Sequence, residues 1–365
     1  MVSLKGLLSK GSKGVGIELS PDRINIAQLS SKGGKKRLVK YATVPVPEGV
    51  FQEGKIVDQS AMAELIQTAL AENKIKAKQA ATAIHGGRDT VTRIIPVPSE
   101  LDDRELRDMV LNQEAGLYLP FPREEADVDY QKLGLFVDED GIEKVQVLLV
   151  ATRREVTDSY LQTFQRAGLA LDVLEISSFA LIRTIREQLL QFGSQEAVVI
   201  VDIEFESTEI SITVDGIPQF SRTVPIGTFQ VQSALSRAMN LPASRSIDLL
   251  QGMTIPLNVD ASGRPTGGNP GTAAMLRILG ELSDELRRSI DFYTNQGENL
   301  EVAQLLLAGP GAVIGQIDEF FTQRLSLPCS LIDPVEALSL ETTADLPASL
   351  RPGLGVVLGL GLREA

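Results

Sequence analysis

A pattern of strands and turns occurs twice in this chain, once near residue 15 and again near residue 197. In the first copy, the apolar run 15–19 (VGIEL) leads through a tight acidic turn into an alternating strand at 24–29 (INIAQL). In the second, the run 197–203 (AVVIVDI) leads through a similar turn into an alternating strand at 208–214 (TEISITV). Alternation of this kind is typical of half-buried β-strands. The repeat therefore predicts two similar α/β halves.

Each copy continues in the same way. A third strand is predicted at 37–45 in the first half and at 217–224 in the second, where Asp215-Gly216 is a hairpin signal. Helices follow at 60–72, 102–117, 228–239 and 272–296. In α/β folds, ligands bind where strand ends converge, so the predicted site is a cleft between the halves.

Composition limits the possible partners. The chain has 365 residues and a net charge of −13, which disfavours binding to nucleic acid. Its one cysteine, Cys329, excludes an internal disulfide framework and a thiolate zinc site. No segment approaches the roughly 18 apolar residues that span a bilayer, and residues 353–362 predict a buried helix. We therefore expect a cytoplasmic protein that meets the membrane only through partners.

The chemistry suited to such a cleft is nucleotide binding. Tight turns can offer backbone N–H groups to phosphates, and carboxylates at strand ends can hold Mg²⁺ through water. Glu18 and Asp202 lie at the ends of the two apolar strands. The segment 307–312 (LAGPGA) follows a further apolar strand at 302–307 and could pack against an adenosine. No P-loop sequence is present.

A series of ordered motifs carries a family resemblance. These are 92–98 (TRIIPVP), 105–114 (ELRDMVLNQE), 118–125 (YLPFPREE), 145–153 (VQVLLVATR), 288–293 (RSIDFY) and 359–363 (GLGLR). In this order they resemble the PilM family, actin-like cytoplasmic proteins of type IV pilus assembly. The resemblance implies an α/β fold with an actin-like (ASKHA) duplicated core and an inserted, FtsA-type small α/β segment.

The resemblance also implies a division of the chain. We expect a flexible basic tail at 1–13, the core's first half at 14–82 and 157–192, the inserted segment at 83–156, and the second half at 193–365 with a flexible loop at 258–271.

The family's nucleotide loops are altered here. Its first loop reads Gly-x-Asp-x-Gly-Ser-Ser-Ser-x-Lys, and this chain has Glu18, Ser20 and Asn25 in place of the Asp, the Gly and the Lys. Pro21-Asp22-Arg23 replaces the three serines, and Glu204 stands where the second loop has glycine. Proline lacks an N–H, and the added carboxylates repel phosphate. The residues carried over as a nucleotide site are Glu18, Ser20, Asn25, Asp202, Thr208, Gly309 and Gly311. ATP and Mg²⁺ are implied as cofactors, but the changed loops predict weak binding and little turnover, and no catalytic residue is assigned.

The resemblance further implies a partner. It is the cytoplasmic tail of the membrane protein PilN, held in a groove between the core and the inserted segment, with motor ATPases and other copies of the chain as further partners. The residues predicted to line the groove are Gly86, Arg93, Leu117, Tyr118 and Phe121. For 118–122 (YLPFP), packing into a core is an equal alternative. The protein would then act as a scaffold at the cytoplasmic face of the inner membrane.

Two rival functions remain open. A kinase-like or ATPase enzyme of the same superfamily would need intact phosphate loops. FtsA itself would end in an amphipathic membrane helix, which differs from the buried helix predicted at 353–362. The single histidine, His85, and Cys329 are predicted to be structural, because no second histidine or base is placed to join either.

Overall fold

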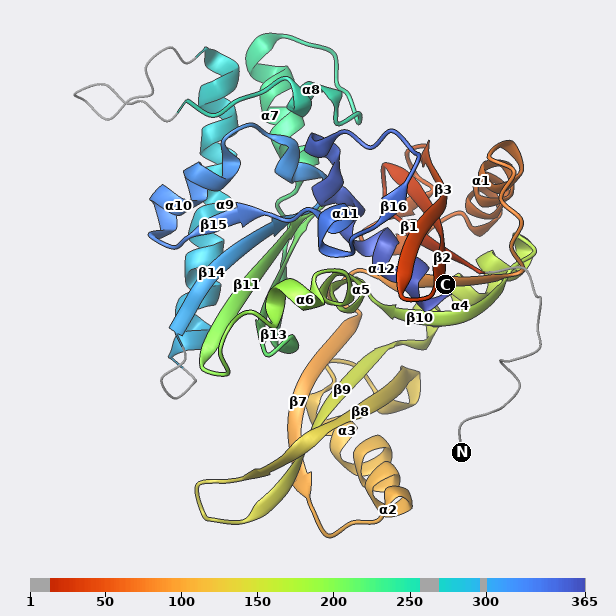
Figure 1. Cartoon of the computed structure of the whole chain (residues 1–365), viewed down its shortest axis with the longest axis vertical. Coiled ribbons are helices and arrows are strands. Elements are labelled where there is room, and N and C mark those ends of the chain that lie inside the picture. Colours follow the sequence, from red (N-terminus) through yellow and green to blue (C-terminus); the bar gives the residue numbers. More distant parts are fainter. Residues whose placement is uncertain (1–13, 257–268, 296–300, 365) are drawn as a thin grey trace.

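A computed structural model of the chain describes residues 14–256, 269–295 and 301–364. Two sheets with helices form the body of the molecule, and a smaller sheet extends from it (Figure 1). The predicted tail at 1–13 lies outside the described residues, as does most of the predicted loop at 258–271. Of that loop, Asn269 caps the following helix with its side-chain oxygen.

The first sheet has the order β10-β6-β1-β2-β3-β16. Its strands are β1 (Val15–Leu19), β2 (Arg23–Lys32), β3 (Lys35–Pro45), β6 (Gln79–Ile84), β10 (Ala170–Ile176) and β16 (Glu341–Thr342). Helices α1 (Gln59–Glu72) and α4 (Arg154–Arg166) pack on it with Ile66, Tyr160 and Phe164 fully buried. A small hairpin, β4 (Phe51–Gln52) and β5 (Lys55–Ile56), precedes α1.

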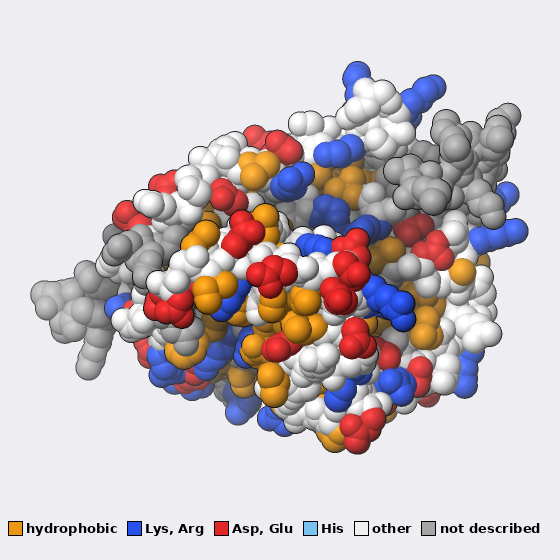
Figure 2. All heavy atoms as spheres, turned by 90° about the horizontal axis from the view of Figure 1, so that it is seen from below, with side chains coloured by type: hydrophobic (Ala, Val, Ile, Leu, Met, Phe, Trp, Pro, Cys, Tyr) orange, Lys and Arg blue, Asp and Glu red, His pale blue; other side chains and the backbone are white. Residues whose placement is uncertain are grey.

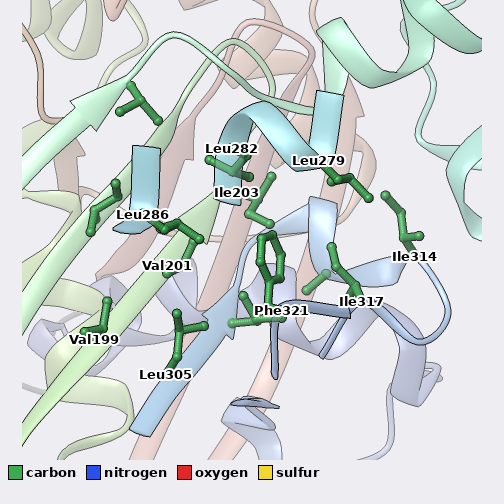
Figure 3. Close-up of a cluster of buried hydrophobic side chains, with 14 of the residues drawn as sticks. Val199, Val201, Ile203, Leu279, Leu282, Leu286, Leu305, Ile314, Ile317 and Phe321 are labelled. Carbon is green, nitrogen blue, oxygen red and sulfur yellow. The ribbon is translucent and has the colours of Figure 1, made fainter. Parts of the chain in front are cut away.

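The second sheet repeats this arrangement in the order β13-β12-β11-β14-β15. Its strands are β11 (Glu196–Ile203), β12 (Thr208–Val214), β13 (Ile217–Val224), β14 (Glu301–Ala308) and β15 (Cys329–Leu331), and its main helices are α7 (Thr228–Met239), α8 (Asp248–Gln251), α9 (Pro270–Thr294) and α10 (Ile317–Leu325). In its core, Val199 and Val201 of β11 face Leu286 of α9 and Phe321 of α10 (Figure 3). In both sheets the first strand pairs antiparallel with the next strand and parallel with a later one, which confirms the predicted duplication.

The end of the chain differs from the prediction. We assigned all of 193–365 to the second half, but β16 pairs with β3 of the first sheet. Helix α12 (Gly355–Arg363), which follows α11 (Pro334–Ala337) and the 3-10 turns η5 (Ala348–Leu354), packs closely on β1. A Cβ at Gly16 would lie only 2.3 Å from the backbone nitrogen of Gly361, so glycine is required for this contact. An apolar helix can cover either sheet, and the sequence pattern does not say which.

The two halves share a common apolar junction. Helices α5 (Ser177–Thr184) and α6 (Arg186–Leu189) follow β10, and α5 packs with α12. One buried cluster contains Ala81 of β6, Leu181 of α5, Ile200 of β11, Leu306 of β14 and Leu360 of α12. Burial of apolar surface from both sheets in one cluster holds the halves together at this side.

A smaller sheet with its helices extends below the core (Figure 1). We call residues 90–153 the module. Its sheet has the order β7-β9-β8 and is formed by β7 (Thr90–Pro98), β8 (Ala126–Val137) and β9 (Glu143–Arg153). The predicted helix at 102–117 consists of α2 (Asp103–Asp108), a π-helical turn η2 (Met109–Glu114) and α3 (Ala115–Tyr118), followed by the 3-10 turn η3 (Arg123–Glu125). Leu106 and Val110 of this helical run are buried and pack against Ile95, Val147 and Leu149 of the sheet.

Within the described residues, no helix is both long and apolar enough to cross a bilayer. The longest helix, α9, alternates buried and charged positions along its length.

Candidate functional site

The turn after β1 closes on itself. The Ser20 hydroxyl donates to the Asp22 carboxylate at 3.0 Å, and the Ser20 amide donates to the Arg23 carbonyl at 2.9 Å. Pro21 contributes no N–H group. The Ser20 hydroxyl and amide are therefore engaged within the turn and are not free for a phosphate.

The Arg23 side chain lies between the two halves. Its Nη2 is 2.8 Å from Glu204 Oε2 in the turn after β11, and 3.7 Å from Glu18 Oε1 on β1. Its Nη1 donates to Asp22 at 3.1 Å. The side chains of Arg23, Glu18 and Glu204 are 15%, 2% and 9% exposed, so these charges meet largely out of water. Charge-assisted hydrogen bonds are strong in such surroundings.

Asn25, two residues after Arg23 on β2, hydrogen-bonds to the same cluster. Its Nδ2 donates to Glu18 Oε2 at 3.1 Å, and its Oδ1 accepts from the Tyr41 hydroxyl at 3.3 Å. Residues two apart on a strand share a face, so Arg23 and Asn25 lie on the same side of β2. Arg23 therefore brings a guanidinium to the face of β2 that carries Asn25, where the resemblance implied a lysine.

Two acids of the cleft, Glu18 and Asp202, have raised pKa values. Burial, and after it the nearby Glu204, raise the pKa of Glu18 from 4.5 to about 7 against the opposing effect of Arg23. Burial and the neighbouring Glu204 and Glu209 likewise raise the pKa of Asp202. Asp202 Oδ2 and Glu18 Oε1 are buried without a hydrogen-bond partner. The cleft is therefore short of positive charge.

The second half supplies a close-packed wall. Gly309 has φ +80°, and a Cβ there would lie 2.5 Å from the Ile203 carbonyl oxygen and 2.6 Å from Asp202 Oδ1. A Cβ at Gly311 would lie 2.3 Å from Cγ2 of Ile203. The Thr208 hydroxyl donates to the Ile226 carbonyl at 2.6 Å, which engages it in the fold.

These residues do not suit a nucleoside triphosphate with Mg²⁺. A triphosphate needs cations and free N–H donors, whereas here the only guanidinium among the named cleft residues already pairs with carboxylates. The Glu204 amide donates to Ser207, and the amides of Thr228 and Phe229 at the start of α7 donate to carbonyls of the same turn. Within the described residues, no group of three or more acids, histidines or cysteines is arranged to hold a metal ion.

The five predicted groove residues do not form one exposed surface. Leu117 and Tyr118 of α3 are 75% and 37% exposed, and Arg93 is exposed on β7. Phe121 is only 6% exposed, and the Arg153 guanidinium covers its ring at 4.7 Å. Phe121 therefore belongs to the module's core, which is the packing alternative. Gly86 lies against the second half, because a Cβ there would be 2.9 Å from the Thr223 hydroxyl.

The module's end of the molecule carries mixed chemistry. Figure 2, which views that end, shows hydrophobic side chains in patches among acidic and basic ones. Besides Leu117, the side chains of Leu135, Val137 and Ile142 on the β8–β9 hairpin are more than half exposed. Exposed apolar side chains of this size suit contacts with a partner.

His85 and Cys329 take no part in the cleft cluster by direct bonding. His85 Nε2 lies 3.1 Å from the Leu19 carbonyl oxygen, just beyond β6. Cys329 begins β15, and burial raises the pKa of its thiol to about 12. A thiol held protonated is a poor nucleophile.

Sequence reasoning missed the role of Arg23. It was noted only as one of three residues that replace serines. The signal that could have found it is its spacing, two residues before Asn25 on an alternating strand. Its partner in the other half cannot be found from spacing.

Comparison with known proteins places this geometry in a family. The family model for the type IV pilus assembly protein PilM matches residues 16–248 and 276–365. The chain belongs to the PilM family. Its fold is actin-like, as the solved structures similar to this PilM-family chain also show.

Three solved structures illustrate the likeness. A chain from a PilM-PilN type IV pilus biogenesis complex aligns with a TM-score of 0.80 and 24% identity, over 96% of this chain and 98% of that one. The ethanolamine utilization protein EutJ from Carboxydothermus hydrogenoformans aligns with a TM-score of 0.53 and 12% identity, over 98% and 93%. MreB 5 of Spiroplasma citri bound to AMPPNP aligns with a TM-score of 0.50 and 12% identity, over 98% and 97%.

Proposed function

We propose that this chain is a scaffold of type IV pilus assembly that binds the cytoplasmic tail of PilN through its module. Through that tail it would sit at the cytoplasmic face of the inner membrane and join the membrane complex to motor ATPases. The observation that carries the proposal is the nearly full-length structural similarity of this PilM-family chain to a chain of a PilM-PilN type IV pilus biogenesis complex.

The module has features that suit peptide capture. Leu117, at 75% exposure, projects from a helical run that is anchored by Leu106 and Val110. Lys55 of β5 pairs with Asp89, just before β7, at 2.9 Å, and Arg153 pairs with Asp89 at 3.0 Å. These ion pairs tie the module to the first half, so a groove between them would be preformed. An extended peptide binds most tightly where the groove needs little rearrangement.

A scaffold needs no catalytic site, and the cleft offers none suited to phosphoryl transfer. The buried carboxylates and the paired Arg23 oppose an incoming triphosphate. We therefore assign ATP and Mg²⁺ no chemical role in the proposed function.

The test is binding of a fluorescent peptide of the cognate PilN tail to the purified full chain, measured by anisotropy. Leu117→Asp should weaken binding at least tenfold, because it places a charge in an apolar contact. The matched control is Leu135→Asp, which alters an apolar residue of 63% exposure in the same module.

The outcomes separate cleanly. Loss of binding in Leu117→Asp alone supports a groove beside α3. Loss in Leu135→Asp alone would move the contact to the β8–β9 hairpin and overturn the proposed groove. A wild-type chain that does not bind the peptide would overturn the proposed partner.

A further inference from the structure

Several hydrogen bonds and ion pairs join the turns of the two halves directly, residue to residue. Besides the Arg23–Glu204 pair, the Glu53 amide in the β4–β5 hairpin donates to Glu206 Oε2 at 2.8 Å. Arg245, which precedes α8, donates to the Pro21 carbonyl at 2.5 Å and lies 4.8 Å over the Phe205 ring. The Ser177 hydroxyl of α5 donates to the carboxylate of Glu209 on β12 at 2.8 Å.

All of these hydrogen bonds and ion pairs cross from one half of the core to the other. Glu53, Pro21, Arg23 and Ser177 belong to the first half, and each contacts a residue of the second half. Two of the contacts reach the turn after β11, at Glu204 and Glu206, and Arg245, the partner of Pro21, lies over the Phe205 ring of the same turn. A phosphate bound between two hairpin turns would bring the same turns together by accepting donors from both.

We propose that the Arg23 guanidinium takes the place of a bound nucleotide, so that the chain closes its own cleft by pairing Glu18 and Asp22 of the first half with Glu204 of the second. In a nucleotide-dependent cleft, the ligand's phosphates are the negative charges that bridge the halves. Here Glu204 supplies the negative charge on one side, and Arg23 supplies the positive charge from the other. The closed arrangement is then a permanent property of the fold.

Charge and space both indicate that Arg23 replaces a nucleotide in the cleft and does not share the cleft with one. Among the described cleft residues, Glu18, Asp22 and Glu204 already outnumber the one guanidinium that they contact. A triphosphate would add further negative charge to buried acids, at a high cost in a poorly solvated site. Removing Arg23 from Glu204 to make room would leave that carboxylate unpaired.

Closure also sets the module's surroundings. The β4–β5 hairpin touches Glu206 through Glu53, and through Lys55 it touches Asp89, which lies just before the module and pairs with the module's Arg153. On the far side, Gly86 fits against Thr223 and Glu209 of the second half. A cleft that is closed without ligand therefore holds the module in one orientation.

The test measures the distance across the cleft directly. In the full chain with Cys329→Ser, spin labels on Thr68→Cys of α1 and Arg237→Cys of α7, both exposed sites, report the separation of the halves by pulsed electron resonance. With Arg23 intact, the two spin labels should give one narrow distribution of distances, and millimolar ATP with Mg²⁺ should not shift it. Arg23→Gln should at least double the width of the distribution. Arg277→Gln, which breaks an exposed ion pair within α9, is the matched control and should leave it unchanged.

Each outcome decides the proposal. A wild-type distribution that narrows or shifts with ATP would show that the ligand, and not Arg23, completes closure. A folded Arg23→Gln chain with an unchanged distribution would show that the guanidinium is dispensable. If Arg23→Gln does not fold, Glu204→Ala removes the same bridge from the other side. It should broaden the distribution, and an unchanged width in that variant would equally overturn the proposal.

Discussion

Arg23 and Glu204 stand 181 residues apart in the chain, and their side chains meet at 2.8 Å across the cleft. Arg23 begins β2 directly after the turn that follows β1, and Glu204 lies in the turn that follows β11, so the duplicated fold brings equivalent positions of its two halves face to face. In an actin-like fold this is the place of convergent strand ends. The same architecture that can hold a nucleotide here holds an ion pair.

Breaking this pair should be costly. Arg23→Met removes the cation and leaves Glu204 as a buried carboxylate without a counterion, so we expect the free energy of unfolding to fall by about 3–5 kcal/mol. Denaturation in urea measures this loss. Arg277→Met, at an exposed pair within one helix, should change it by no more than about 0.5 kcal/mol. Equal effects of the two changes would mean that the cleft pair stabilises no more than a surface pair.

The raised pKa of Glu18 predicts a pH dependence of stability. The folded chain holds the proton up to about pH 7, whereas the ordinary pKa is 4.5. Proton binding by Glu18 therefore stabilises the folded chain. This contribution to the free energy of unfolding is fully present below pH 4.5 and is lost as the pH rises through 7, and it amounts to roughly 3 kcal/mol. Glu18→Gln keeps an oxygen for Asn25 and carries no charge.

The comparison of Glu18→Gln with the wild type separates the effect of Glu18 from those of its ionisable neighbours Arg23, Asp202, Glu204 and His85, which both chains share. The variant should match the wild type in unfolding free energy near pH 4.5 and exceed it increasingly up to pH 8. A constant difference across that range would show that Glu18 does not change its charge there.

The repeated hairpins were predictable because alternation along a strand depends only on local sequence. Strands at 15–19, 208–214 and 217–224 have the predicted bounds. The family resemblance supplied the actin-like arrangement, which no local pattern specifies. The division of the chain into the predicted segments stays a prediction, apart from the C-terminal end, where β16 and α12 join the first sheet.

The cleft was predicted in its position and only partly in its content. Asn25 in place of the implied lysine, and the extra acid at Glu204, were visible in the sequence, and the weak nucleotide binding that they predict stays a prediction. The bridge itself depends on the approach of residues in different halves, which is a tertiary property. Phe121 shows the reverse difficulty, since an aromatic residue between prolines fits a surface or a core equally well until its neighbours are known.

Because α12 packs closely on β1, adding one methyl group at Gly16 should destabilise the chain. Gly16→Ala would place a Cβ 2.3 Å from the Gly361 nitrogen and 2.8 Å from the Val357 carbonyl oxygen, where backbone must move. We expect a loss of about 1–3 kcal/mol in the free energy of unfolding, as for overpacked cores. Gly116→Ala in α3 meets no atom within 4 Å and should stabilise the chain slightly through helix propensity. Thermal melting of both variants tests the pair, and a neutral Gly16→Ala would show that α12 is displaced easily.

Burial predicts opposite outcomes for two apolar residues of the module. Phe121→Asp puts a charge into a packed cluster with Val91, Ala126 and Ala151, so it should unfold the module. Leu117→Asp alters a side chain of 75% exposure and should change the free energy of unfolding by less than about 1 kcal/mol. Circular dichroism and hydrogen exchange over residues 90–153 separate the two, and a fully protected Phe121→Asp chain would contradict the packing seen here.

Rebuilding the lost charge pattern should create a nucleotide site. The combined change Arg23→Ser, Asn25→Lys and Glu204→Gly removes the bridge, puts a cation beside Glu18 and frees the second turn of its carboxylate. We expect affinity for ATP with Mg²⁺, measured by calorimetry, to rise at least tenfold over the wild type, which corresponds to about 1.4 kcal/mol. Asn25→Lys alone is the matched control. It adds the same cation while Arg23 still pairs with Glu204, so it should gain little. If the single change binds ATP as well as the combined one, the Arg23–Glu204 pair is not what keeps phosphate out of this cleft.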